Sequence, residues 1–294
     1  MAGARQIVDP PAFTPLPYGL WDAVEPRNPG DPHWQNGVTW VERCPQGDTT
    51  YDECLSVTGT GGPPPEPPVK TDNVDQNFRG ATPFTVVAEF DCSPVGVADA
   101  TAAAEDALAR VEQEQVETAF WTGTAGGQPL VFPHLAANTE IVDSNDILLQ
   151  PTATVCVTGQ DAAHALGALE ACLSDCYTGQ GLIHVPLTVL PTLAAWNLVQ
   201  ERGGELFTTA GNRVVVGGGY TGTGPDGSAA PDGTAWIYAT GAAFGYRGNV
   251  RIPPLRESID RSTNTMRMIA ERTYVIGYEC CLLAANLNLG VPTT

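Results

Sequence analysis

The chain has 294 residues. This exceeds the roughly 100–200 residues of a typical single domain, so we expect one large domain or two interleaved ones. It carries 33 acidic and 14 basic residues, a formal net charge of −19, which repels phosphate backbones and excludes sequence-specific nucleic-acid recognition. Only 16% of the residues are charged. Soluble domains have roughly 25% charged residues, so the low fraction indicates large protein interfaces.

The segment Met1–Pro10 has no apolar run of signal-peptide length, and no stretch approaches the roughly 18 apolar residues of a membrane span. We therefore expect a soluble protein made in a cytoplasm, with its eight cysteines as reduced thiols. Cys172 and Cys176 lie four apart in a predicted helix, but no further pair of ligands follows at the spacing of a zinc site. We predict buried apolar thiols and no bound metal.

Residues 1–95 show little periodicity and are interrupted by many prolines, including the tract Gly61–Pro68. This composition is typical of an extended arm followed by a loop with a stiff, polyproline-like tip. On either side of the tip, His33–Val41 and Thr82–Phe90 have the aromatic and β-branched content of strands. We predict a long two-stranded excursion, which should lie on a neighbouring surface because an isolated ribbon is marginal in water.

Asp99 opens the longest predicted helix, Ala100–Trp121, which lacks glycine and proline and is followed by Gly123 as a C-terminal cap. At about 1.5 Å per residue it should exceed 30 Å in length. Its apolar residues do not form one stripe, so we expect several packing partners along it. A second helix over Asp161–Tyr177 has a clear apolar stripe and should pack on a core.

The second half of the chain alternates between predicted strands and helices, which indicates a compact α/β unit. A Gly-rich loop over Gly217–Gly233 divides it. The predicted elements are the strand Gly181–Val185, a helix around Pro191–Arg202, the hairpin strands Glu205–Thr209 and Arg213–Val216, the strand Thr234–Thr240, the extended segment Met266–Tyr278 and the short apolar segment Cys280–Leu287.

Motifs that would indicate catalysis or cofactor binding are weak. Gly217–Gly222 matches GxGxxG, but a dinucleotide site needs these glycines to open a helix, and the residues that follow predict a loop. No GxSxG, Walker-type or HExxH spacing is present. His184 lies among alternating apolar residues of a predicted strand, and at such a position a hydrogen-bonded core imidazole is favoured over a catalytic base. We predict no catalytic residues and no cofactor.

The order of the segments is more informative than any single motif, and it resembles the major capsid protein of tailed bacteriophages, whose fold is shared with encapsulins. Glu105–Gly123 looks like the long spine helix of the peripheral domain in that family. Gly181–Pro186, followed by a helix, looks like the axial-domain strand that precedes the core helix. Met268–Tyr278 and the short strand after it look like the last peripheral strand and its return to the axial domain.

The resemblance implies an α+β capsid fold. Its parts would be an N-terminal arm at 1–30, an extended β-loop at 31–95, a peripheral domain at 96–160 and 250–278, an α/β axial domain at 161–249, and a return to the axial domain at 279–294. The aromatic and proline side chains of the loop and spine helix would then supply assembly contacts. These are Trp34, Trp40, Pro64, Pro65, Phe84, Phe90, Phe120 and Trp121.

The function implied by the resemblance is structural. Copies of the chain would assemble through hexamers and pentamers into an icosahedral virion shell, built in a bacterial cytoplasm and enclosing double-stranded DNA without sequence-specific contacts. The resemblance also allows a separate scaffolding, portal or decoration protein as a partner. Three alternatives remain: another virion structural protein of the tail or decoration type, an encapsulin-like shell, and an acidic cytoplasmic enzyme that acts on a small substrate.

Overall fold

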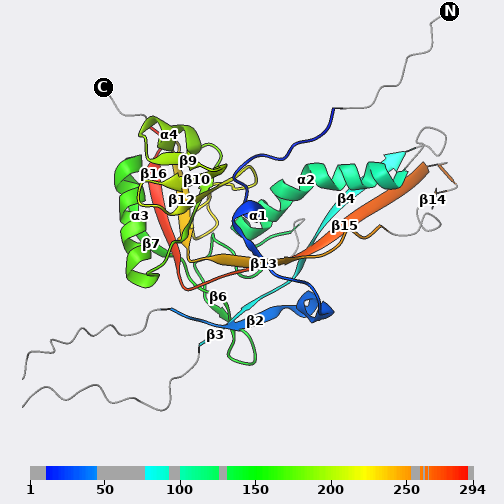
Figure 1. The fold of residues 1–294 in the computed structure, drawn as a ribbon, viewed down its shortest axis with the longest axis horizontal. Coiled ribbons are helices and arrows are strands. Elements are labelled where there is room, and N and C mark those ends of the chain that lie inside the picture. The colour runs from blue at the N-terminus through cyan, green and yellow to red at the C-terminus, as the bar shows by residue number, and fades with distance from the viewer. Residues whose placement is uncertain are drawn as a thin grey trace, which may run out of the picture.

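A computed structural model describes residues 11–44, 77–92, 100–125, 131–252, 259–260, 262–263 and 265–290. Within these residues the chain forms three β-sheets and has two visibly different parts (Figure 1). One part is a compact layer of strands flanked by α3 (Ala162–Cys176) and α4 (Leu190–Ala195). The other is elongated and consists mainly of α2 (Ala100–Thr122) lying along two long strands.

The compact part is built on a mixed seven-stranded sheet with the order β7-β16-β12-β8-β11-β10-β9. Its central strands β8 and β11 run parallel, and β12 is antiparallel to both β8 and β16. The strands are β7 (Thr154–Gln160), β8 (Leu182–Pro186), β9 (Val199–Arg202), β10 (Glu205–Thr208), β11 (Arg213–Gly217), β12 (Thr234–Thr240) and β16 (Leu282–Asn288).

The central strands of this sheet, β16, β12, β8 and β11, are buried on both faces, which explains why they read as nearly continuous apolar runs. The edge strands β7 and β9 are largely exposed. In β8, Ile183 and Val185 point into the core that α3 covers. Leu182 on the same strand points to the opposite side and joins the core that contains Phe120 of α2. The sheet therefore lies between α3 and the C-terminal end of α2, and side chains alternate between the two cores as the two-residue period of a strand requires.

The predicted helices over 100–121 and 161–177 are confirmed as α2 and α3. Helix α2 ends before Gly123, which has a φ of +74°. At the start of α3, the carboxylate of the N-cap residue Asp161 accepts the backbone N–H of His164 at 3.0 Å. The predicted helix over 191–202 is wrong in its second half. It ends at Ala195, and Asn197 takes the left-handed conformation with a φ of 53°. The next residues form β9, which pairs antiparallel with β10.

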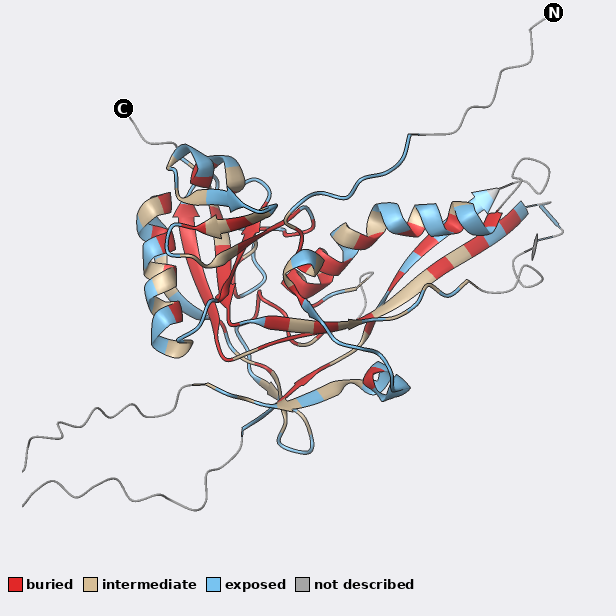
Figure 2. Ribbon diagram, in the orientation of Figure 1, coloured by how far each residue is buried: buried red, intermediate tan, exposed pale blue. Residues whose placement is uncertain are grey.

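The elongated part contains a five-stranded sheet. Its long strands β4 (Phe84–Cys92) and β15 (Thr265–Tyr278) pair antiparallel over their whole overlap, from Phe84 opposite Tyr274 to Cys92 opposite Met266. Helix α2 covers one face of this pair, and the other face is largely exposed (Figure 2). The remaining strands are β1 (Glu25–Pro26), β13 (Ala243–Arg247) and β14 (Ile259–Asp260).

A four-stranded sheet with the order β2-β3-β6-β5 lies below the long strands in Figure 1. It consists of β2 (Val38–Val41), β3 (Phe78–Ala81), β5 (Ile141–Val142) and β6 (Leu148–Gln150). In the N-terminal segment, a short helix α1 (Leu20–Ala23) and a 3₁₀ helix η1 (Pro32–Asn36) precede β2.

The prediction that residues 33–41 and 82–90 form a two-stranded ribbon is therefore wrong. Residues 38–41 pair with 78–81, whereas the strand that begins at Phe84 belongs to the five-stranded sheet. Pro83 lies between these two strands and has no N–H for a strand ladder, so it separates the two pairings. His33 to Asn36 form a 3₁₀ turn instead of a strand, because the Asp31 carboxylate caps the N–H of His33 at 2.9 Å. The Pro-rich tip and Asp99 lie outside the described residues.

Mixed helices and sheets confirm the α+β class. Within the described part of the chain, we find no helix that combines the length and the apolar character needed to cross a bilayer.

Candidate assembly surfaces

Glu112 holds the elongated part together from the middle of α2. Its carboxylate accepts hydrogen bonds from Arg247 of β13 at 2.7 Å, from Arg272 of β15 at 2.7 and 2.9 Å, and from the hydroxyl of Tyr274. The residue is only 9% exposed, so the two guanidinium groups offset the cost of burying its charge. Burial and the neighbouring carboxylate raise the pKa of Tyr274, which keeps its hydroxyl a donor.

The N-terminal arm is fixed to α2 by Gln113, which directly follows Glu112, and by Glu117, which lies one helical turn further along. The Gln113 side chain accepts the N–H of Leu16 at 3.0 Å and donates to the carbonyl of the same residue at 3.2 Å. The Glu117 carboxylate accepts the N–H of Leu20 at 3.3 Å and that of Gly219 at 3.0 Å. Desolvation raises the pKa of Glu117, although the backbone N–H groups partly oppose it. The arm thus lies along α2 as a strap, with a cavity of about 160 Å³ beneath it.

The outer face of the β4–β15 ribbon is open to contact with another molecule. Val86 and Ala88 of β4 point toward α2 and are buried, whereas Val87 between them points outward and is 46% exposed. On the same outer face, Glu89 forms an ion pair with Arg267 of the neighbouring strand. This face combines apolar and paired charged side chains, as interface surfaces do.

A second exposed apolar group lies on the four-stranded sheet. Val41 of β2 stands directly opposite Phe78 of β3, and their exposed fractions are 36% and 44%. Exposed apolar side chains that are neighbours in a sheet indicate a contact surface more strongly than isolated ones.

The predicted contact residues fall into three groups. Trp34, Phe84, Phe120 and Trp121 are buried within the subunit, where they stabilise its own cores. Trp40 and Phe90 are partly buried and pack against cores of the subunit, so their contact with a neighbour stays a prediction. Pro64 and Pro65 lie outside the described residues.

We did not single out Val41, Phe78 or Val87 from the sequence, because we did not separate the two faces of each strand. Alternation along residues 84–91 is the signal that would have found Val87.

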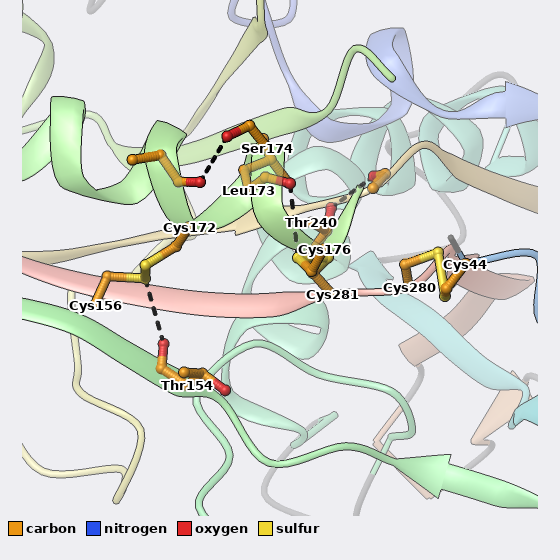
Figure 3. The surroundings of a disulfide bond; sticks show 12 residues. Cys44, Thr154, Cys156, Cys172, Leu173, Ser174, Cys176, Thr240, Cys280 and Cys281 are labelled. Atoms are coloured by element: carbon orange, nitrogen blue, oxygen red, sulfur yellow. Dashed lines mark hydrogen bonds between the residues drawn. A yellow bond between two sulfur atoms is a disulfide. The ribbon is translucent and has the colours of Figure 1, made fainter. Parts of the chain in front are cut away.

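The expectation of reduced thiols is wrong, because six cysteines are paired in disulfides (Figure 3). Pairs that are far apart in the sequence have Cα atoms close enough for a bond, at 5.3 to 6.4 Å. We inferred the redox state from the absence of a signal sequence, which does not report on which thiols the fold brings together. The bonds are Cys44–Cys280, Cys156–Cys172 and Cys176–Cys281.

Among the described residues, one group has metal-ligand character: Glu42, Cys44 and Cys280. Metals bind thiolates, and the two sulfur atoms of this group are joined in a disulfide. The Glu42 carboxylate is in an ion pair with Arg79. In the oxidised chain these atoms are therefore engaged with protein partners.

The Gly-rich loop over Gly217–Gly233 packs on α2, where Gly219 contacts Thr118 and Glu117. As predicted, the residues that follow β11 form a loop and not a helix. A side chain at Gly219 would collide with the backbone carbonyl of Glu114. The glycine thus permits the close approach that lets its N–H reach Glu117.

His184 is a core residue, in agreement with the prediction. It is fully buried, and its ring nitrogens lie 3.0 Å from the hydroxyls of Tyr220 and Thr240. Burial lowers its pKa to about 3, so the ring is neutral at physiological pH. A neutral imidazole with both nitrogens engaged stabilises the sheet–helix interface instead of presenting a base to a substrate.

Comparison with known proteins shows the fold. No protein-family model and no curated protein matches the sequence. Among solved structures, the capsid of an empty GTA particle matches with a TM-score of 0.56 and 10% identity, covering 98% of this chain and 94% of the other. Microbacterium phage Oxtober96 gives a TM-score of 0.51, 12% identity and coverages of 97% and 95%. The capsid of Ralstonia phage GP4 gives a TM-score of 0.50 and 9% identity, and the match covers 100% of this chain and 97% of the other.

These matches cover nearly the full length of both partners, so the likeness includes the order and the packing of the elements. The chain therefore has the fold of tailed-phage capsid proteins, which confirms the resemblance inferred from its sequence. At 9 to 12% identity the matches show the fold, and the role of this chain follows as a proposal.

Proposed function

We propose that the chain is a structural capsid subunit that assembles through hexamers and pentamers into a closed icosahedral shell around phage DNA. The observation that carries the proposal is the full-length match to the capsid of a GTA particle, at a TM-score of 0.56 over 98% of the chain. The acidic composition agrees with this role, because a net charge of −19 lets DNA be enclosed without adhering to the shell.

In this proposal the two parts of the molecule have different tasks. The seven-stranded layer with α3 and α4 is the axial domain, which gathers around the symmetry axis of a hexamer or pentamer. The elongated part with α2, β4 and β15 is the peripheral domain, which reaches toward neighbouring subunits. Its outer face and the neighbouring apolar pair Val41 and Phe78 support this assignment, because both leave apolar side chains exposed on one subunit.

The proposed role is noncatalytic. The buried, neutral His184 is hydrogen-bonded on both ring nitrogens within the core. Glu112 and Glu117 line the cavity of about 160 Å³ beneath the arm, but their carboxylate oxygens accept hydrogen bonds from the subunit itself and so contribute to its stability. A separate scaffolding, portal or decoration protein would complete the particle. Assembly would take place in the cytoplasm of a bacterial host.

Negative-stain microscopy of the purified full-length chain tests the proposal. We expect closed shells, or rings with five- or six-fold symmetry. Uniform monomers at high protein concentration, with and without lysate from the same expression host, would contradict it. Filaments or tubes would favour the tail alternative, and an activity that requires no assembly would favour the enzyme alternative.

Val87→Asp sharpens the same experiment. Val87 is 46% exposed on the outer face of β4, so a carboxylate there should leave the subunit folded and prevent an apolar contact with a neighbour. Thr101→Asp is the matched control for an added carboxylate, because Thr101 is exposed on α2, away from this face. We expect loss of shells for Val87→Asp together with an unchanged circular dichroism spectrum, and a smaller effect for the control.

A further inference from the structure

Cys280 and Cys281 are adjacent in the sequence and form disulfides with two different parts of the molecule (Figure 3). They lie in the turn that connects β15 of the five-stranded sheet to β16 of the seven-stranded sheet. Cys280 is bonded to Cys44, which follows β2 of the four-stranded sheet. Cys281 is bonded to Cys176 at the C-terminal end of α3. One turn thus links all three sheets, two by the chain itself and the third by a disulfide.

Noncovalent contacts between the β2–β3 pair and the rest of the subunit are incomplete. Arg79 of β3 donates to the carbonyl of Cys280, and the N–H of Arg43 reaches the Glu279 carboxylate at 3.4 Å. In the described part of the chain, four buried side-chain polar atoms lack a hydrogen-bond partner, and three of them lie at this junction. They are Trp40 Nε1, Arg79 Nε and the Tyr278 hydroxyl oxygen.

The apolar contacts of the junction form a small core that is separate from the two main ones. It consists of Trp34, Ala81 and Val275, with Val38, Trp40 and Tyr246 partly buried against it. Such a core and several unsatisfied polar groups give a region a low free energy of local opening. The Cys44–Cys280 bond crosses this junction and joins the chain just after β2 covalently to the turn before β16.

Disulfides do not persist in a reducing cytoplasm, but they do on virions outside the cell. Together with the geometry of the turn, this leads to a proposal that rests on the proposed function. We propose that Cys280 and Cys281 form a redox-controlled junction, which is open during assembly in the host and closes by oxidation after the particle leaves it. Closure fixes the β2–β3 pair and α3 to the same turn, and so stabilises each subunit in the finished shell.

The closing step needs an oxidant, for which a small-molecule disulfide such as oxidised glutathione suffices. The Cys280 thiolate attacks one sulfur of the oxidant and forms a mixed disulfide, which releases one small thiolate. The Cys44 thiolate then attacks the Cys280 sulfur and releases the second small thiolate. Two cysteine thiols are oxidised, one oxidant disulfide is reduced to two thiols, and the two protons end on those thiols. The same sequence joins Cys176 and Cys281.

Amide hydrogen exchange of the full-length subunit tests the junction directly. After treatment with a reducing agent, we expect the exchange rates of the amides in Val38–Val41 and Phe78–Ala81 to rise about tenfold or more, while amides of β12 stay unchanged. The variant with Cys44→Ser and Cys280→Ser should show the same rise without reductant. The control variant with Cys156→Ser and Cys172→Ser should not, because its bond joins only β7 and α3.

Peptide mapping tests the connectivity. Trypsin cuts at Arg43, Lys70, Arg110, Arg202 and Arg272, which isolates the six disulfide-bonded cysteines in peptides 44–70, 111–202 and 273–294. In oxidised particles we expect one species that contains all three peptides. Cys280→Ser should release 44–70 from it, and Cys281→Ser should release 111–202 from 273–294.

Two results would overturn the proposal: free thiols at Cys280 and Cys281 in particles isolated under air, or equal exchange of β2 and β3 with and without reductant. Both readouts can be measured on unassembled subunits as well. Failure of the chain to form shells would therefore contradict the proposed capsid function while leaving the junction measurable.

Discussion

The two parts of the subunit are stabilised in different ways. The seven-stranded layer is buried on both faces, and its core against α3 consists of aliphatic side chains such as Leu166 and Leu169. The elongated part has one covered face, and its most buried polar groups are the carboxylates of Glu112 and Glu117 on α2. A layer covered on both sides can rely on apolar packing alone. A ribbon covered on one side has less apolar area to bury and uses charge-assisted hydrogen bonds to fix its helix.

This difference also separates folding from assembly. Because the central strands of the compact layer are covered on both faces within one subunit, the layer provides the rigid frame of the subunit. The elongated part keeps exposed apolar residues such as Val87, which have no partner in one subunit. The hydrogen bonds of Glu112 and Glu117 within the subunit hold that exposed face in a fixed shape. A neighbouring subunit therefore does not have to order this face on contact.

Glu112→Ala should give the largest effect in the elongated part. It leaves Arg272, whose side chain is 17% exposed, and Tyr274 without their shared acceptor. Breaking a buried ion pair by removing one partner costs about 3–5 kcal/mol, and we expect a loss of that size in the free energy of unfolding. Urea unfolding followed by fluorescence measures it.

The control for this variant is Glu105→Ala, an exposed carboxylate of the same helix, which should change stability by less than about 0.5 kcal/mol. Equal effects of the two variants would contradict the stabilising role of the hydrogen bonds that Glu112 accepts.

Leu169→Ala probes the compact layer, where stabilisation is apolar. Leu169 is fully buried on α3 against the seven-stranded sheet. Truncation removes its transfer free energy and leaves a cavity, for which we expect a loss of about 3 kcal/mol. Leu187→Ala makes the same chemical change at a position that is 45% exposed, so it should cost much less. The loss at Leu169 should not depend on salt concentration, whereas the loss at Glu112 should be smaller in high salt.

Several elements of this fold could be predicted from the sequence because the signals are local. Helix α2 has no internal glycine or proline and ends before Gly123, and α3 begins after the N-cap Asp161, so both ranges were predictable. The apolar strand that contains His184 was predictable as core for the same reason. The capsid fold followed from the order of such elements, and the structural matches confirm it.

The features that could not be predicted depend on contacts between distant residues. Nothing near Cys44 indicates that it meets Cys280 across 236 residues. Similarly, Phe120 and Trp121 end an amphipathic helix with a weak stripe, and only the position of the seven-stranded sheet shows that they face a core instead of a neighbour. Glu112 and Glu117 look like ordinary surface carboxylates of an acidic helix until β15 and the arm are placed beside them.

The smallest expected effect concerns pH and Glu117. Desolvation raises the pKa of this carboxyl above its ordinary value of 4.5, so between that value and its folded pKa the folded state binds more protons than the unfolded state. Stability falls with rising pH wherever the folded state holds the extra proton. Glu117 therefore makes a contribution to the free energy of unfolding that decreases as the pH rises through the range above 4.5.

Glu117→Gln cannot titrate, so the stability of the natural protein relative to this variant should decrease as the pH rises from about 4 to about 7. The amide also replaces one acceptor oxygen, which weakens the bond to Leu20 or Gly219 and lowers stability at all pH values by a constant amount. Only the pH-dependent part of the difference reports the titration. Glu105→Gln removes one charge from the exposed side of the same helix and corrects for net charge. A difference that grows with pH would mean that the N–H groups outweigh desolvation and that the pKa is lowered.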